Sequence, residues 1–513
     1  MKQLGIWMHW LWSPGTEGYG CTGFGCLEEI DGSVISVLLV NCFLLDPVSN
    51  KLMENHEVIQ MENMKGRGVM LFPLPFQGHL NPMFQLANTL HAKGFSITII
   101  HTQFNSPNPS NYPHFRFCSI ADGLSENQVV SSEIDDLIAL VKILNSNCVT
   151  PFRDCLAKLL SSNVEDPIVC LVTDALWHFT QPVADGLKLP RIVLRTSNVF
   201  SFLVHKSLPS LHEKGYLSVQ DSQAENHVPE FSPLKFKDIH RVETSHLESL
   251  LQFSSIIIQE VKASSGLIFN SNEDLEQEAL TKCSLDFPIP TFAIGPFHKY
   301  FPASSCSSLL PQDQSCISWL DKQAPNSVIY VSFGSLAAMN EADFLEVAWG
   351  LANSKHPFLW VVRPGLVHGS EWLELLPNGF LEMLGGRGNI VKWAPQQEVL
   401  AHPSTGGFWT HCGWNSSLES LCEGVPMICQ PSFGDQKVNA RYISHVWKVG
   451  VHLEFKIERG EIEKAIKRLM VDAEGQEMRD RVKLLKEKMN LCLNPGGSSY
   501  KSLDNLVTYM LSL

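Results

Sequence analysis

A strand–loop–helix–strand unit near residue 70 is the feature that most restricts how this chain can fold. Residues 69–73 form a short apolar strand, a loop containing Pro and Gly follows, and a helix is expected over residues 80–92. Gly94 ends this helix, and the β-branched residues 96–101 form the next strand. Because a crossover helix between two strands joins parallel neighbours, the pattern predicts an α/β protein with a parallel sheet.

Strand and helix patterns of this kind continue in two series along the chain. The first series has further strands at residues 168–173 and 191–194, with a helix at 182–187 between them. The second follows a Ser- and Pro-rich stretch, with strands at residues 327–332, 358–362, 390–392, 407–410, 426–429 and 449–453. We therefore expect two Rossmann-like, doubly wound domains that face a cleft.

The domain boundaries follow from these two series. We predict a first domain over residues 65–303, a linker over 304–314, a second domain over 315–495, and a helix over 496–513 that packs back on the first domain. Residues 1–64 show no helical or strand periodicity, and we interpret them as an extension that is disordered or not native. The folded protein is then expected to begin near Met61.

Composition excludes several classes of partner. The formal net charge of −14 argues against nucleic acid, whose phosphates attract basic surfaces. The longest N-terminal apolar run, residues 34–45, contains Asn41 and is too short to span a bilayer. The 14 cysteines lack a disulfide framework or zinc-ligand spacing, which favours reduced thiols in the cytoplasm.

Two polar residues fall at one edge of the predicted first sheet. His79 lies in the loop after the first strand, and Asp174 directly follows the strand at 168–173. Ligands bind outside the carboxyl ends of parallel strands, so a histidine–carboxylate pair could form there. Taken singly, a loop histidine is more often a surface residue, and such an aspartate is more often a helix cap.

Other nucleotide and hydrolase motifs are missing from the sequence. The turn after the first strand has one glycine, and the second strand ends without an acid, so a dinucleotide fingerprint is absent. No phosphate-binding P-loop, nucleophile elbow or His-Glu-x-x-His zinc motif occurs. In the second domain, His411 and Gly413 precede a helix that begins near Asn415 and Ser416, where free N–H groups attract anions. This turn suits a diphosphate, although an ordinary capped helix with a glycine turn has the same pattern.

The 44 residues from Trp393 to Gln436 resemble the signature box of plant UDP-dependent glycosyltransferases. The match includes Trp-Ala-Pro-Gln, His-Cys-Gly-Trp-Asn-Ser and Gly-Asp-Gln at fixed spacing. That family has the GT-B fold, and the resemblance implies an acceptor-binding first domain and a UDP-sugar-binding second domain. It also implies donor contacts from Thr196, Ser335, Trp393, Ala394, Gln396, His411, Trp414, Asn415, Ser416, Glu419, Asp435 and Gln436.

The resemblance further implies a mechanism and a class of acceptor. His79 is the expected catalytic base and Asp174 its partner, with UDP-glucose as donor and no metal or other cofactor. Segments such as residues 73–79, 173–177 and 294–298 are most similar to the branch with cytokinin, diterpenoid and small hydroxy-acid glucosyltransferases. Within it, the sequence most resembles members that act on small plant-defence acids such as salicylic, isoleucic or N-hydroxypipecolic acid, so we favour a hydroxyl or carboxyl group of such an acid. Cytokinin-type members lack a histidine at the position of His79, which favours oxygen over nitrogen acceptors. A cytokinin, terpenoid or flavonoid acceptor and an inactive UDP-sugar-binding homologue are the alternatives.

Overall fold

The computed structural model describes residues 66–124, 134–162, 166–217, 221–239, 244–302, 308–367, 370, 372–454 and 456–513. The strand–loop–helix–strand unit predicted near residue 70 is present in it. β1 (Gly68–Phe72) pairs in parallel with β2 (Ser96–Thr102), and α4 (Gln77–Ala92) connects them. The chain divides into two units, residues 1–63 and 64–513, and all of the described residues belong to the second. The extension predicted at residues 1–64, and residues 304–307 of the predicted linker, lie outside the described residues.

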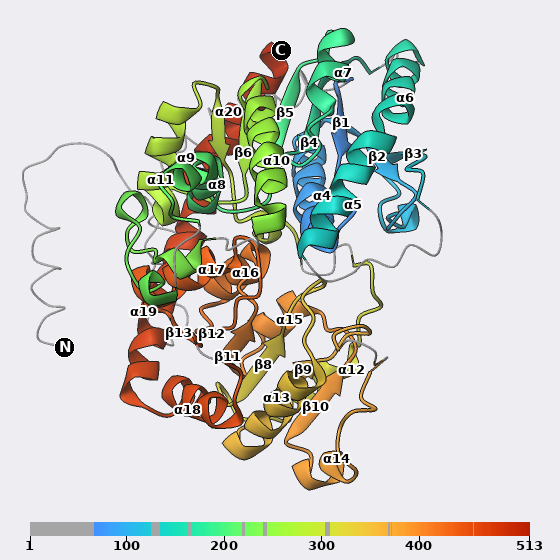
Figure 1. Ribbon diagram of the computed structural model, residues 1–513. Coiled ribbons are helices and arrows are strands. Elements are labelled where there is room, and N and C mark those ends of the chain that lie inside the picture. Colours follow the sequence, from blue (N-terminus) through green and yellow to red (C-terminus); the bar gives the residue numbers. More distant parts are fainter. Residues whose placement is uncertain are drawn as a thin grey trace, which may run out of the picture. The chain divides into compact units, whose positions relative to one another are not determined.

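The first sheet has seven parallel strands in the order β3-β2-β1-β4-β5-β6-β7 (Figure 1). The strand order reverses between β1 and β4, as in doubly wound folds that bind ligands at this point. The other strands are β3 (Arg116–Ile120), β4 (Ile168–Asp174), β5 (Arg191–Arg195), β6 (Gly266–Phe269) and β7 (Thr291–Ala293). The helices are α5 (Ile134–Asn147), α6 (Val149–Ser162), α7 (Thr180–Gly186), α8 (Val199–Lys206), α9 (Leu208–Glu213), α10 (Thr244–Lys262) and α11 (Glu273–Asp286).

The second sheet repeats this topology with six parallel strands in the order β10-β9-β8-β11-β12-β13. Its strands are β8 (Val328–Ser332), β9 (Phe358–Val361), β10 (Gly388–Val391), β11 (Thr405–Thr410), β12 (Met427–Cys429) and β13 (Gly450–His452). Its helices are α12 (Ser315–Leu320), α13 (Glu341–Ser354), α14 (Phe380–Leu384), α15 (Gln396–Ala401), α16 (Trp414–Glu423), α17 (Gln436–Arg441), α18 (Arg459–Met470) and α19 (Ala473–Leu493). Two doubly wound parallel sheets confirm the predicted fold class.

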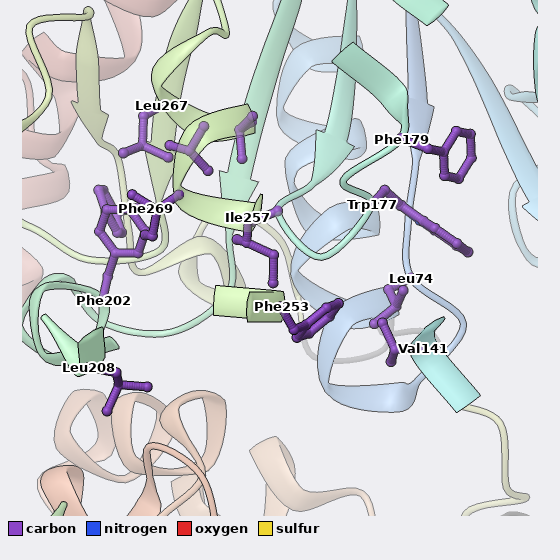
Figure 2. Packing of buried hydrophobic residues seen from close by; sticks show 14 of the residues in the cluster. Leu74, Val141, Trp177, Phe179, Phe202, Leu208, Phe253, Ile257, Leu267 and Phe269 are labelled. Carbon is purple, nitrogen blue, oxygen red and sulfur yellow. The ribbon is translucent and has the colours of Figure 1, made fainter. Parts of the chain in front are cut away.

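The strands are buried on both faces, which explains why they read as continuous apolar runs. Met70 and Phe72 of β1 join the cluster on one face, and Val69 and Leu71 join the cluster on the other. Figure 2 shows members of the first cluster, among them Leu74, Val141 and Phe253.

The last helix, α20 (Ser498–Ser512), packs on the first sheet and not on the second. Its side chains at helical spacing, Leu503, Leu506, Val507 and Met510, belong to the cluster of Val69 and Leu71. Tyr509 Oη donates a hydrogen bond to the backbone oxygen of Ser265, 2.6 Å away. Figure 1 shows this dark red helix beside the strands of the first sheet. None of the described helices is both long enough and apolar enough to cross a membrane.

The structure corrects several local predictions. The strands β3, β6 and β7 were not predicted, and most predicted strand ends differ by one or two residues. The first helix begins at Gln77, so His79 lies in its first turn and not in a loop. The backbone oxygen of Phe76 accepts hydrogen bonds from His79 N and Leu80 N, both 2.8 Å away, which starts the helix early.

Candidate active site

A cavity of about 440 Å³ lies between the carboxyl ends of the two sheets. It is lined by residues that follow β1, β4 and β5 in the first domain and β8, β10 and β11 in the second. Every predicted site residue except Asp174 lines it: His79, Thr196, Ser335, Trp393, Ala394, Gln396, His411, Trp414, Asn415, Ser416, Glu419, Asp435 and Gln436. The structure therefore brings the predicted residues of both domains together around one space.

The predicted histidine–carboxylate pair is formed. His79 Nδ1 lies 2.7 Å from Asp174 Oδ2, and the Asp174 side chain is 1% exposed whereas that of His79 is 24% exposed. The other Asp174 oxygen, Oδ1, accepts a hydrogen bond from Leu176 N at 2.9 Å. A carboxylate only accepts hydrogen bonds, so the His79 proton lies on Nδ1, and Nε2 is the nitrogen that can take a proton from a bound molecule. Thr196 Oγ1, at 3.2 Å from His79 Nδ1, also fixes the ring.

The turn between β11 and α16 is built around His411. A Cβ atom placed on Gly334 or on Gly413 would lie 2.5 Å from His411 Nε2, so both positions require glycine for the ring to fit. Gly334 also has a φ of +74°, which glycine adopts without strain. Burial lowers the pKa of His411 to about 4, so its ring is neutral at pH 7.

The first turn of α16 presents polar groups at the end of the helix where anions bind. Asn415 Nδ2 donates to the backbone oxygen of Gly78 at 2.8 Å, which connects this helix to the helix that carries His79. The indole nitrogen of Trp414 donates to the backbone oxygen of Asn270 at 2.8 Å, and this side chain is 3% exposed. The indole thus fastens α16 to the first domain.

A cluster of amides and a carboxylate lies beside Trp393. Gln396 Nε2 donates to Glu419 Oε2 at 2.7 Å and to Ser416 Oγ at 2.9 Å, and Gln397 Nε2 donates to Glu419 Oε1 at 3.1 Å. Burial raises the pKa of Glu419, while the two glutamines that donate to it act in the opposite direction. A half-buried indole next to such acceptors can stack on a planar ring and accept hydrogen bonds from hydroxyl groups.

One acidic residue, Asp435, and one amide residue, Gln436, lie at the start of α17 and end the signature box. Gln436 Oε1 accepts hydrogen bonds from Ser432 N at 2.8 Å and Phe433 N at 3.1 Å. Asp435 Oδ2 lies 3.2 Å from Asn439 Nδ2, and burial raises the Asp435 pKa. Among the residues that the structure describes, no group of three or more His, Cys, Asp or Glu side chains is placed to hold a metal ion.

The first-domain side of the cavity carries many apolar side chains. From the sequence, we predict that loops including parts of residues 137–147 and 200–205 contribute to it, and Leu140, Leu144, Phe200 and Phe202 suggest an apolar lining, although ordinary core packing is the slightly preferred interpretation for any one of them. These segments are helices, and none of the four candidates lines the cavity. The side chains that do line it include Leu74, Phe76, Leu137, Ile138, Val141, Leu176, Val204, Leu208, Ile239, Leu250 and Phe253.

Sequence reasoning also missed a cation in this lining. Arg195 is the last residue of β5 and borders the cavity next to Thr196. Arg195 ends β5, which pairs with β4, the strand that ends at Asp174. The rule that ligands bind beyond the carboxyl ends of parallel strands would therefore have identified Arg195 from the sequence.

Comparisons with known proteins agree with this geometry. A family model described as UDP-glucoronosyl and UDP-glucosyl transferase matches residues 86–483. UDP-glycosyltransferase 76B1 of Arabidopsis thaliana is 56% identical over 444 residues, which cover 86% of this chain and 98% of that protein. UDP-glycosyltransferase 76G1 of Stevia rebaudiana is 51% identical over 452 residues, which cover 87% of this chain and 97% of that protein.

Solved structures give the same result. A UDP-glucose: anthocyanidin 3-O-glucosyltransferase in complex with UDP matches with a TM-score of 0.75 and 27% identity, covering 88% of this chain and all of that one. Phytolacca americana UGT2, complexed with UDP-2fluoro-glucose and pterostilbene, matches with a TM-score of 0.72 and 27% identity, covering 87% of this chain and 99% of that one. The chain therefore belongs to the plant family 1 UDP-glycosyltransferases, a family of transferases with the GT-B fold.

Proposed function

We propose that this protein transfers glucose from UDP-glucose to a hydroxyl or carboxyl group of a small plant metabolite, with a small hydroxy acid as the favoured acceptor and with inversion at the anomeric carbon. The observation that carries the proposal is the position of His79, which is hydrogen-bonded to Asp174 and borders the same cavity as the first turn of α16. A base and an anion-binding helix end in one cavity are what a displacement with a diphosphate leaving group requires.

In this mechanism, His79 is the general base. The acceptor oxygen forms a bond to the anomeric carbon as its proton passes to His79 Nε2, and the bond from that carbon to the UDP oxygen breaks. UDP leaves with the electron pair, so an α-linked donor gives a β-glucoside. Asp174 holds the ring in the required tautomer and stabilises the imidazolium that forms. General-base catalysis contributes about 10²- to 10⁴-fold to the rate.

The second domain is proposed to bind the donor. Trp393 stacks on uracil and Ala394 contacts it through the backbone, while Gln396 and Glu419 bind the ribose hydroxyls. The neutral His411, Asn415, Ser416 and Ser335 bind the diphosphate, and Thr196, Trp414, Asp435 and Gln436 contact glucose. The supporting observation is that all of these residues border the same cavity. The helix end at α16 supplies partial positive charge to the leaving group, so we propose that no metal ion is needed.

A small hydroxy acid is the acceptor class that we favour. The apolar first-domain lining suits a compact hydrocarbon body, and the presence of His79 suits an oxygen acceptor. A flavonoid is the main alternative, because a relative 44% identical to this chain is named flavonol 3-O-glucosyltransferase.

The test is a glucosylation screen with the purified full chain and UDP-glucose. The acceptor panel contains small hydroxy acids, cytokinins, flavonols and terpenoid alcohols, and mass spectrometry reads the gain of one hexose. Transfer to the hydroxy acids that is lost in His79→Ala supports the proposal. Transfer to another class alone overturns the acceptor assignment, and UDP-glucose binding without any transfer or donor hydrolysis favours an inactive homologue.

Two further parts of the proposal have direct checks. Activity should persist after treatment with EDTA, and a loss that added Mg²⁺ or Mn²⁺ restores would overturn metal independence. A cytoplasmic location stays a prediction, which fractionation of plant cells that express the tagged full chain would check.

A further inference from the structure

One cation borders the cavity without a carboxylate partner. Among the described residues that line the cavity, Arg195 is the one lysine or arginine. Its side chain is half-buried, and it follows β5 directly before Thr196, whose hydroxyl contacts the His79 ring. The guanidinium therefore belongs to the same end of the cavity as the proposed base.

The hydrogen bonds of Arg195 leave most of its donors unused. Its Nε donates to Ser197 Oγ at 3.0 Å, and its guanidinium carbon lies 5.5 Å from the centre of the Phe202 ring. No described residue accepts a hydrogen bond from either terminal nitrogen. Ser197 and Phe202 thus hold the stem and one edge of the guanidinium while the other edge stays available.

The two carboxylates whose charges act on Arg195, those of Asp174 and Asp435, are hydrogen-bonded to other residues. The charges of Asp174 and Asp435 oppose the lowering of the Arg195 pKa that burial causes, but no ion pair joins Arg195 to either carboxylate. Asp174 receives hydrogen bonds from His79 and from Leu176 N, and Asp435 is bonded to Asn439. Since arginine stays charged at neutral pH, this cation can be neutralised by an anion that enters the cavity.

A carboxylate matches the free edge of the Arg195 guanidinium in shape and charge. Guanidinium groups bind carboxylates through two parallel hydrogen bonds, which fix both distance and orientation. The lining of the same cavity includes apolar side chains such as Leu74, Val141 and Phe253, which suit a hydrocarbon body on the ligand. Arg195 lines the same cavity as Thr196, whose hydroxyl contacts the His79 ring, so one bound molecule can present an anionic group to the guanidinium and a hydroxyl to the base.

We propose that Arg195 determines acceptor specificity by binding the carboxylate of a small hydroxy acid while its hydroxyl faces His79. This inference rests on the proposed function and narrows its substrate class to acids that carry both a carboxylate for Arg195 and a free hydroxyl for His79. Because the carboxylate is held by Arg195, the glucose is transferred to the hydroxyl, and the product is an O-glucoside and not a glucose ester.

The experiment compares two acceptors that differ only at the charged group. The probes are 2-hydroxy-3-methylpentanoate and its primary amide, each with UDP-glucose and the full chain. The variants are Arg195→Met, which keeps an apolar stem, and Arg195→Lys, which keeps a point charge. The readout is the ratio of kcat/KM for the acid to kcat/KM for the amide, which a general loss of activity or folding does not change.

The wild-type enzyme should prefer the acid, and Arg195→Met should lower the ratio by about tenfold to a hundredfold, because charge-assisted hydrogen bonds are lost. The ratio for Arg195→Lys should lie between those of the wild-type enzyme and Arg195→Met, because a lysine keeps the charge but lacks the bidentate geometry. The wild-type product should resist mild alkali, which cleaves a glucose ester.

Three results would overturn the inference, and they separate it from the proposed function. An equal ratio in all three proteins, with both probes turned over, removes the role of Arg195 and leaves the proposed function intact. A rise in the KM for UDP-glucose with an unchanged ratio assigns Arg195 to the donor. If the wild-type enzyme glucosylates neither probe but does glucosylate a flavonol or a cytokinin, the proposed acceptor class and the inference fail together.

Discussion

A buried ion pair across the domain interface gives the sharpest energetic prediction. Asp238, at the end of the short helix η4 (Phe236–Asp238) of the first domain, accepts hydrogen bonds from Arg441 at the end of α17. The distances are 2.8 Å from Nε to Oδ2 and 3.0 Å from the terminal nitrogen to Oδ1. Arg441 is 0% exposed and Asp238 is 2% exposed. Arg441 also contacts Glu454 at 2.7 Å, whereas Asp238 also accepts from Lys235 N at 2.8 Å.

The two single variants should have unequal costs. Arg441→Met leaves the Asp238 carboxylate buried without its cation, and breaking a buried pair in this way costs about 3–5 kcal/mol of unfolding free energy. Asp238→Asn should cost about 2 kcal/mol, because an amide oxygen still accepts from Lys235 N and Arg441 keeps Glu454.

The double variant gives the decisive comparison. Once Arg441 is a methionine, a neutral asparagine at position 238 is easier to bury than a carboxylate. Asp238→Asn should therefore be neutral or stabilising in the Arg441→Met background, although it destabilises the wild-type protein. The unfolding free energies of the four proteins in urea, followed by tryptophan fluorescence, measure this coupling.

An exposed pair serves as the control. Arg153 and Asp154 are 3.3 Å apart with side chains that are 54% and 65% exposed, so Arg153→Met should change stability by less than about 0.5 kcal/mol. If Asp238→Asn has the same cost in both backgrounds, the two residues are not coupled. If Arg441→Met costs no more than Arg153→Met, burial does not strengthen the interdomain pair.

Four further predictions concern the catalytic site and the response to pH. His79→Ala should lower kcat by about 10²- to 10⁴-fold, and a loss below tenfold in a glucosylation assay would contradict its role as base. Gly334→Ala places a Cβ atom 2.5 Å from His411 Nε2, so it should raise the KM for UDP-glucose by about tenfold through displacement of the ring and backbone strain. The same change should have a clearly smaller effect in a His411→Ala background, and equal effects would refute the steric reasoning. Burial lowers the pKa of His298 from 6.5 to about 3, so the unfolded chain takes up this proton first as the pH falls. Stability should therefore decrease from pH 6.5 towards pH 3, and urea midpoints of His298→Gln should decrease less. Although burial alone would raise it, neighbouring cations lower the pKa of Glu454 from 4.5 to about 2. The contribution of the Glu454 carboxylate to the unfolding free energy is therefore present above pH 4.5 and lost towards pH 2. Glu454→Gln should remove this part of the decrease in stability between pH 4.5 and pH 2.

Much of the fold could be predicted because parallel strands are buried on both faces. Their apolar runs stand out in the sequence, and the rule about carboxyl ends placed His79 and Asp174 at one edge, where the structure has them 2.7 Å apart. The missed strands lack this signal. β3 alternates irregularly between exposed and half-buried residues, and β6 and β7 have only four and three residues.

The lining of the acceptor side could not be predicted for a different reason. Helix α5 carries apolar residues at helical spacing, and Leu137 and Val141 border the cavity while Leu140 and Leu144 lie in the core. All four have the same chemistry and are at most 8% exposed. What distinguishes them is the element that packs opposite each one, and this depends on contacts between segments far apart in the sequence.

The contact between α4 and α16 shows how a local defect in a helix becomes part of the site. Pro82 lies inside α4 and has no backbone N–H, so the oxygen of Gly78, four residues earlier, lacks its helical donor. That oxygen instead accepts a hydrogen bond from Asn415 Nδ2 in the other domain. Because His79 follows Gly78 and Asn415 belongs to the first turn of α16, this bond ties the proposed base to the proposed diphosphate site. The sequence pattern predicted a helix that starts at residue 80, and it could not reveal this role of Pro82, because the donor that replaces the missing N–H lies in the other domain.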